Sequence, residues 1–325
     1  MRRWFAGFGF LASVVSFSAV SAAAAEEWPT HPVRIVNTFA AGGAADVLCR
    51  IVAAHLTEAF HQQFYVETRP GAAGAIGVQS VVSTPPDGYN FVLTNVSILS
   101  VAPTSKPKLS YNPKRDLTHI AYIAGSPIVL SVNPKSGWKS IADFVAAAKK
   151  SGKPMTYSSS GIGSMGQLIG ESFAHLAGIE VEHVPYKGAS QGLMDLVAGH
   201  IAFSSQTVSS TAGQLRGGGL VGLAITANER LPDYPDIPTF KEVGYPGLVS
   251  TIWFSLSAPA GLPADIVAKV NHEIVKGMAT PETQARLRQD GMITEPMTPE
   301  ELSRYVDAET ARWKPVIERA GLVAK

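Results

Sequence analysis

Two glycine-rich segments carry the residue types best suited to binding a small molecule. The first is Gly42-Gly43, and the second is Ser158 to Ser164, where three serines precede Gly161 and Gly163. Each lies between a β-branched run and a helical pattern, so each would open a helix whose first backbone N–H groups have no partner within that helix. The helix dipole adds partial positive charge there, so an anion can bind without lysine or arginine. Either turn alone could be only a tight turn, but two together predict a cleft for a ligand with one or two carboxylates.

The second segment also matches a dinucleotide-binding pattern. Gly161-Ile162-Gly163-Ser164-Met165-Gly166 fits G-x-G-x-x-G, and Glu180 lies about 20 residues further on, where such a fold needs an acid. A mid-chain position in a chain with an export signal argues against a dinucleotide-dependent oxidoreductase, which stays a remote alternative. The eight histidines show no metal-ligand spacing, and Ile162 replaces the first glycine of a nucleophile elbow. We therefore expect no enzyme activity, no cofactor and no metal.

The N-terminus has the pattern of a secretory signal. Arg2-Arg3 precedes an uncharged apolar run over residues 4–20, and Ala23-Ala24-Ala25 fits the A-x-A cleavage pattern. A membrane anchor is the alternative, but the run is short for a span of about 20 residues, and Glu26-Glu27 follows at once. The sequence predicts a signal peptide over residues 1–25 and a periplasmic mature protein.

Charge and cysteine content limit the partners. Without residues 1–25 the chain has 300 residues, with 25 Lys and Arg against 26 Asp and Glu, a net charge of −1. A nearly neutral chain has no electrostatic reason to bind nucleic acid or a membrane surface. Cys49 is the only cysteine, so no internal disulfide can form, and we expect a buried apolar residue rather than a reactive thiol. We expect the protein to be a monomer. We expect two lobes within it, because 300 residues exceed one ordinary hydrophobic core.

Short β-branched runs alternate with helical patterns, which is typical of an α/β fold with mostly parallel sheets. The predicted strands are 33–39, 64–68, 89–94, 155–157, 180–184, 201–204, 220–226 and 252–258. The predicted helices are 44–61, 164–177, 189–198, one from a capping box at Ser140 to about Gly152, and a helical C-terminal segment with a capping box at Thr298. Residues 97–116 carry three prolines and are predicted to be a loop outside the core.

A break within an apolar segment predicts the passage between lobes. Gly125-Ser126-Pro127 interrupts the apolar residues of 119–132. The sequence therefore predicts lobe 1 over residues 26–126 plus 251–325, and lobe 2 over 127–250.

A series of short motifs follows in a fixed order along the chain. They are Trp28-Pro29, Phe39-Ala40-Ala41-Gly42-Gly43-Ala44-Ala45-Asp46, Arg69-Pro70-Gly71-Ala72-Ala73-Gly74, Pro86-Asp87-Gly88-Tyr89, Tyr157 to Ser164, His183-Val184-Pro185-Tyr186-Lys187-Gly188, Pro238-Thr239 and Ala258-Pro259-Ala260-Gly261. In this order and spacing they are specific, and the chain resembles the substrate-binding proteins of tripartite tricarboxylate transporters, the Bug family, over nearly all of the mature chain. The resemblance implies a type II periplasmic binding protein, or Venus flytrap, whose lobes close on a carboxylate held by backbone amides and ordered waters at the two turns. It implies delivery to the membrane components of a secondary transporter; a membrane sensor protein is the alternative partner.

Three departures from the family bear on the ligand. Ala41 stands where members often have Pro, Gln167 where many have His, and the neutral segment 201–207 where many have Asp. Because a buried ammonium without a counter-charge costs several kcal/mol, we favour aliphatic or aromatic di- and tricarboxylates over amino acids. Phe39 and Phe203 favour an aromatic dicarboxylate such as terephthalate, although both could be ordinary core residues.

The predicted ligand-binding set combines both turns with neighbouring strand ends. Asp46 could instead be a helix cap. The set is Phe39, Ala41, Gly43, Ala44, Ala45, Asp46, Asn95, Ser158, Ser160, Gly161, Gly163, Ser164, Gln167, Phe203, Gln206 and Thr207.

Overall fold

The computed structural model describes Met1, residues 28–105, residues 109–319 and Val323. Nearly all of the predicted signal peptide therefore lies outside the described residues. None of the described helices is both long and apolar enough to span a membrane.

Nine strands form a mixed sheet in the order β2-β1-β3-β9-β4-β7-β5-β6, and β8 also pairs with β4. In one half, β1 (Val33–Asn37) pairs in parallel with β2 (Phe64–Thr68) and β3 (Asn90–Asn95), and β9 (Thr251–Pro259) is antiparallel to β3. In the other half, β5 (Met155–Ser159) pairs in parallel with β6 (Val181–Pro185) and β7 (Phe203–Thr207), while β8 (Val221–Ile225) is antiparallel to β4.

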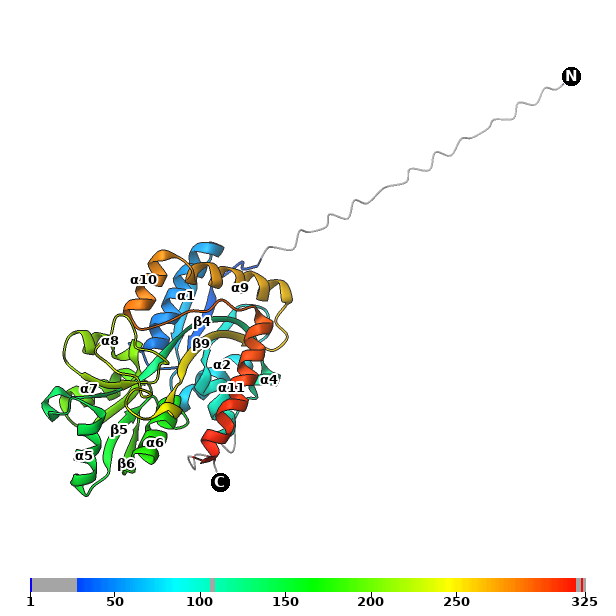
Figure 1. Cartoon of the computed structure of the whole chain (residues 1–325). Helices are drawn as coiled ribbons and strands as arrows, with labels where there is room; N and C mark the ends of the chain where they lie inside the picture. Colours follow the sequence, from blue (N-terminus) through cyan, green and yellow to red (C-terminus); the bar gives the residue numbers. More distant parts are fainter. Residues whose placement is uncertain (2–27, 106–108, 320–322, 324–325) are drawn as a thin grey trace.

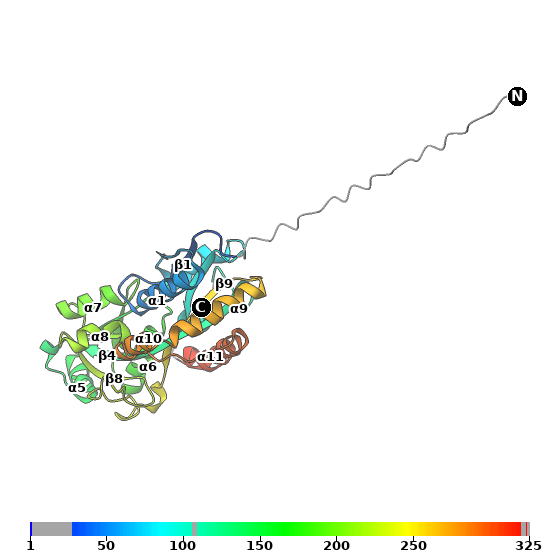
Figure 2. The same cartoon turned by 90° about the horizontal axis from the view of Figure 1, so that it is seen from above.

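The strand β4 (Leu117–Val132) joins the two halves. It pairs with β9 as far as Pro127 and with β7 from Ile128 onward. The partner strand thus changes at the predicted break, Gly125-Ser126-Pro127. We call β1, β2, β3, β9 and the first part of β4 lobe 1, and β5 to β8 with the rest of β4 lobe 2. The fold is a two-lobed α/β fold, and Figure 2 shows the two groups side by side.

Helices cover both lobes (Figures 1 and 2). Those of lobe 1 are α1 (Ala44–Phe60), α2 (Ala75–Val82), α3 (Ala102–Ser105), α4 (Pro113–Asp116), α9 (Ala264–Met278), α10 (Pro281–Gln289) and α11 (Pro299–Arg319). Those of lobe 2 are α5 (Ile141–Ser151), α6 (Met165–Ala177), α7 (Ala189–Ala198) and α8 (Val208–Arg216).

The capping box predicted at Thr298 is complete, and at Ser140 the hydroxyl half of the predicted box is present. The Ser140 hydroxyl accepts the Asp143 N–H at 3.1 Å. At the start of α11, Thr298 Oγ1 accepts the Glu301 N–H, and the Glu301 carboxylate accepts the Thr298 N–H. Each bond satisfies an N–H that the first helical turn leaves without a partner.

The predicted loop over 97–116 is wrong for its first part. Ser97–Val101 forms a π-helical turn that continues into α3, and its five residues are buried. Pro103 cannot donate a backbone hydrogen bond to this helix. The Tyr111 hydroxyl instead donates to the Ile98 carbonyl at 2.9 Å, so a buried side chain replaces the donor that proline lacks.

Lobe 2 differs from the sequence prediction in one strand and one helix. The strand predicted at 201–204 lies at Phe203–Thr207, because three further polar residues, Ser205 to Thr207, continue it beside β4 and are buried there. The helix α8 was not predicted. Cys49 is fully buried in α1, as expected of a core residue, and burial raises the pKa of its thiol to about 12.

A candidate ligand site between the lobes

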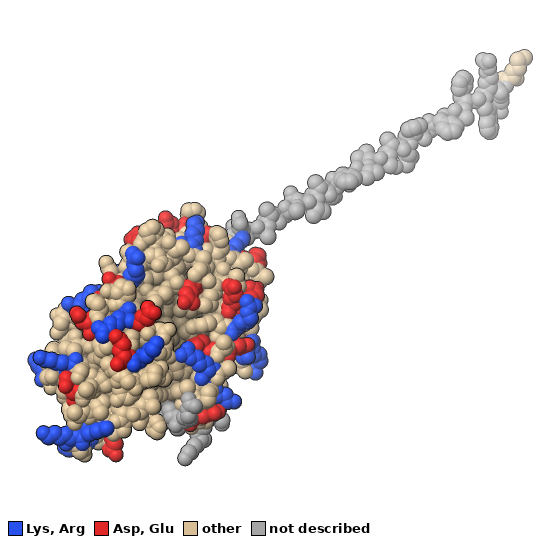
Figure 3. Space-filling model, in the orientation of Figure 1, with Lys and Arg blue, Asp and Glu red and all other residues tan. Residues whose placement is uncertain are grey.

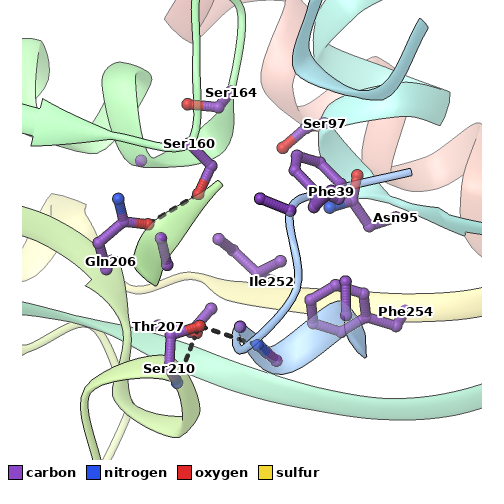
Figure 4. Close-up of a pocket in the computed structure, with 16 residues that line it drawn as sticks. Phe39, Asn95, Ser97, Ser160, Ser164, Gln206, Thr207, Ser210, Ile252 and Phe254 are labelled. Carbon is purple, nitrogen blue, oxygen red and sulfur yellow. Dashed lines mark hydrogen bonds between the residues drawn. The ribbon is translucent and has the colours of Figure 1, made fainter. Parts of the chain in front are cut away.

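The N-termini of α1 and α6 face one cavity between the two lobes. The cavity has about 420 Å³ of empty space, including its opening to solvent. Its walls come from both lobes, as Figure 4 shows. The lining residues are Phe39, Ala40, Gly43, Ala44, Ala45, Asn95, Ser97, Ser160, Ser164, Gly166, Ala189, Gln206, Thr207, Ser210, Ile252 and Phe254.

None of these lining residues is ionisable, so backbone groups and neutral side chains set the electrostatics of the cavity. The Ala45 N–H and Gly166 N–H are the second amides of α1 and α6, and both residues are buried. Within the described part of the chain, neither amide has a hydrogen-bond acceptor. Two helix termini thus present unpaired donors and partial positive charge to the same small space.

The first turn owes its shape to Asp46. Its carboxylate accepts the Gly42 N–H at 3.1 Å and the Arg50 Nε–H at 3.1 Å. Gly42 has φ +83°, a left-handed conformation that glycine adopts without strain. Asp46 is absent from the cavity lining, and its carboxylate holds the turn that precedes the helix.

The second turn is held by its own side chains. Gly163 has φ +80° and donates its N–H to Gln167 Oε1 at 2.7 Å. The Ser164 hydroxyl accepts the Gln167 N–H at 3.2 Å and donates to Ser159 Oγ at 3.1 Å. Behind it, His183 Nε2 and Ser159 Oγ form a 2.6 Å hydrogen bond, and burial lowers the pKa of His183 to about 4. The imidazole is therefore neutral at pH 7.

Among the residues that line this cavity, Gln206 has the one buried side-chain nitrogen or oxygen that makes no hydrogen bond at all. The Ser160 hydroxyl donates to Gln206 Oε1 at 2.7 Å (Figure 4), and the Gln206 side-chain nitrogen has no partner. The residue is only 3% exposed. An unpaired buried donor costs about 1–3 kcal/mol, so a ligand acceptor at this point would relieve that cost.

The structure brings nine of the predicted residues to the cavity and places seven elsewhere. The nine are Phe39, Gly43, Ala44, Ala45, Asn95, Ser160, Ser164, Gln206 and Thr207. Of the others, Asp46, Gly161, Gly163 and Gln167 shape the turns, and the Ala41 carbonyl accepts the Ser190 hydroxyl at 2.9 Å. Ser158 is fully buried against Gly192.

Phe203 is corrected from a cavity residue to a core residue. Its ring stacks on Tyr157 with 4.9 Å between centroids, lies 5.0 Å from Phe144, and is fully buried. It begins β7, whereas Gln206 and Thr207 end it at the cavity. Three residues of strand correspond to about 10 Å, which places the ring well behind the site.

Seven lining residues escaped prediction: Ala40, Ser97, Gly166, Ala189, Ser210, Ile252 and Phe254. Gly166 lay within the G-x-G-x-x-G pattern, which was a usable signal. Ile252 and Phe254 lie on β9, more than 150 residues further along the chain than Asn95, so local sequence could not place them there. Within the described residues, no group of three or more His, Cys, Asp or Glu could hold a metal ion.

The two-lobed fold and the cavity with converging helix termini define a solute-binding protein of the periplasmic binding protein type. Residues 48–322 match the family described as tripartite tricarboxylate transporter family receptor. The chain belongs to this family, which includes the Bug proteins.

Related proteins and solved structures support the same family assignment. The Bordetella pertussis protein BugT is 28% identical over 100% of this chain and 99% of its own. The R. palustris protein Rpa4515, solved with adipate, is 33% identical with a TM-score of 0.88, covering 91% of this chain and 99% of that one. MatC from Rhodopseudomonas palustris, solved with bound malate, is 28% identical with a TM-score of 0.85, covering 89% and 100%.

Proposed function

We propose that this protein captures a small dicarboxylate without an amino group and delivers it to the membrane components of a tripartite tricarboxylate-type transporter. Export to the periplasm with cleavage near Ala25 is part of the proposal, as are lobes of residues 26–126 plus 251–325 and 127–250. The observation that carries it is that two helix N-termini converge on one cavity without ionisable side chains.

The electrostatics favour an anion. The unpaired amides of Ala45 and Gly166 and the side-chain nitrogen of Gln206 are all donors. An ammonium group would find no carboxylate among the lining residues and would pay several kcal/mol for burial. The adipate and malate named for the two R. palustris proteins carry no amine, which supports the same ligand class.

The middle of the ligand meets apolar side chains. Phe39, Ile252 and Phe254 line the cavity; Figure 4 shows Phe39 and Phe254 on the side away from Ser160 and Gln206, and Ile252 between the two sides. An apolar carbon skeleton between two carboxylates, aliphatic as in adipate or aromatic as in terephthalate, matches such a wall. On the face in Figure 3, charges of both signs are interspersed, which supports a small-molecule ligand over a nucleic acid.

The test is calorimetric titration of the mature protein with adipate, malate, citrate, terephthalate and glutamate. Micromolar affinity corresponds to about −8 kcal/mol, and we expect it for a dicarboxylate but not for glutamate. Tight binding of glutamate alone, or no binding across the panel, would contradict the proposal. Uptake in a deletion strain tests the partner: lost uptake supports the transporter, whereas normal uptake with lost gene induction would indicate a sensor.

A further inference from the structure

One hydrogen bond joins each of the two helix N-termini at the cavity to a serine of the opposite lobe. The first amide of α1, Ala44 N–H, donates to Ser210 Oγ of lobe 2 at 3.0 Å (Figure 4). The first amide of α6, Met165 N–H, donates to Ser97 Oγ of lobe 1 at 2.9 Å. The arrangement is reciprocal, and both serines line the cavity.

The hydroxyl protons of Ser97 and Ser210 are available to a ligand. A serine hydroxyl has one proton to donate and two lone pairs to accept. Ser210 Oγ accepts the Ala44 N–H and also the Thr207 hydroxyl at 2.8 Å. Both its lone pairs are used, and its proton has no acceptor among the described residues. Ser97 Oγ accepts the Met165 N–H, and its proton likewise has no acceptor in that part of the chain.

We propose that Ser97 and Ser210 couple ligand binding to lobe closure: each hydroxyl donates its proton to one ligand carboxylate and accepts an N–H from the opposite lobe. This rests on the proposed function, because it assigns one carboxylate to each helix terminus. A hydroxyl that donates to an anion becomes a better acceptor, so the ligand strengthens the bonds that hold the lobes together. Closure strengthens ligand binding by the same factor.

The unpaired donors beside each serine agree with this assignment. The second amide of each helix, Ala45 N–H or Gly166 N–H, follows directly on the amide that the serine accepts. A carboxylate at either terminus could therefore accept from one amide and one hydroxyl at once. The buried nitrogen of Gln206 adds a further donor in the same cavity.

The chain contains a matched control. The Ser190 hydroxyl also bridges the lobes, donating to the Ala41 carbonyl at 2.9 Å. Ser190 is not a lining residue of the cavity. Ser190→Ala therefore removes a bond between lobes without removing a donor to the ligand.

The experiment compares Ser97→Ala, Ser210→Ala and Ser190→Ala by calorimetry, with unfolding temperatures to show that each variant folds. The ligands are the tightest-binding dicarboxylate of the panel and the monocarboxylate with the same carbon skeleton, for example adipate and hexanoate. For the dicarboxylate, we expect Ser97→Ala and Ser210→Ala each to lose about tenfold or more in affinity, the size of a hydrogen bond to a charged group. The monocarboxylate occupies only one helix terminus. Its affinity should therefore fall about tenfold or more in only one of the two variants, Ser97→Ala or Ser210→Ala. Ser190→Ala should weaken both ligands by one common, smaller factor.

Losses in the two cavity variants that equal those of Ser190→Ala for both ligands would overturn the inference while leaving the proposed function standing. No binding across the panel would overturn the proposed function and the ligand half of the inference. Amide hydrogen exchange without ligand would then test the remaining half. Faster exchange of Met165 in Ser97→Ala and of Ala44 in Ser210→Ala supports the bonds between lobes, and unchanged exchange contradicts them.

Discussion

Gly43 allows a direct test of whether the lobes must close on the ligand at this cavity. Its φ of −98° is open to any residue, so a side chain causes no backbone strain. A Cβ there would lie 3.6 Å from Ser210 Oγ and 3.8 Å from the Ala189 side chain, both in lobe 2. Gly43→Ala therefore fits at ordinary contact distance. In Gly43→Leu the next carbon reaches about 1.5 Å further, so the lobes must stay apart.

The cost follows from the bonds lost when the lobes separate. The Ala44–Ser210 and Ser190–Ala41 hydrogen bonds break, each worth about 0.5–1.5 kcal/mol. At least one charge-assisted bond to the ligand is lost as well, worth about 1.5–3 kcal/mol. Together these amount to about 2.5–6 kcal/mol, or about two to four orders of magnitude in affinity.

The assay is calorimetry with the tightest-binding dicarboxylate on Gly43→Leu and its matched control Gly43→Ala. We expect Gly43→Leu to lose about a hundredfold or more in affinity, with an unfolding temperature close to wild type. Gly43→Ala should stay within about tenfold of wild type. A folded Gly43→Leu protein that binds as tightly as Gly43→Ala would refute the reasoning, because the ligand would then lie elsewhere or bind without closure.

Three further outcomes are expected. Gln206→Glu places a carboxylate where an unpaired donor faces the cavity, so its affinity for the dicarboxylate should fall more than about tenfold. The affinity of Gln206→Leu should fall less, and equal losses in the two variants would show that charge is not the cause. Phe203→Ala should lower the free energy of unfolding by about 3–5 kcal/mol, whereas Phe39→Ala should mainly weaken ligand binding; denaturant titrations and calorimetry on both variants separate core from cavity. Burial lowers the pKa of His119 and of His183 to about 4, below the unfolded value of about 6.5. Their contribution to the free energy of unfolding is therefore complete above pH 6.5 and is lost as the pH falls toward 4. Urea unfolding of the wild-type protein between pH 4.5 and 8 measures this loss, and a flat profile would show that these histidines titrate normally.

The two turns show how far local pattern carries a site prediction. A strand, a glycine pair and a helix start are visible in sequence because their conformations depend on neighbouring residues. Both turns do open helices at the cavity, at Ala44 and Met165. The same pattern did not show which atoms face inward. Gly163 donates to Gln167 and serves the turn, whereas Gly166 lines the cavity and has the unpaired amide.

Aromatic residues show the opposite limit. Phe203 and Phe254 are equally apolar and both lie on strands. Phe203 packs in the core against Tyr157, and Phe254 lines the cavity because β9 runs beside β4 at the junction of the lobes. Which face and which end of a strand meets the ligand depends on sheet order, and sheet order involves residues far apart in the chain.

The amino-acid sequence was sufficient for the two glycine turns, most strand and helix positions, and the helix caps at Ser140 and Thr298. Each of these depends on local backbone preference or on short-range periodicity. The pairing of each helix terminus with a serine of the opposite lobe, Ala44 with Ser210 and Met165 with Ser97, required the folded chain. These partners are 166 and 68 residues apart, and they meet only because β4 and β9 hold the two lobes against each other.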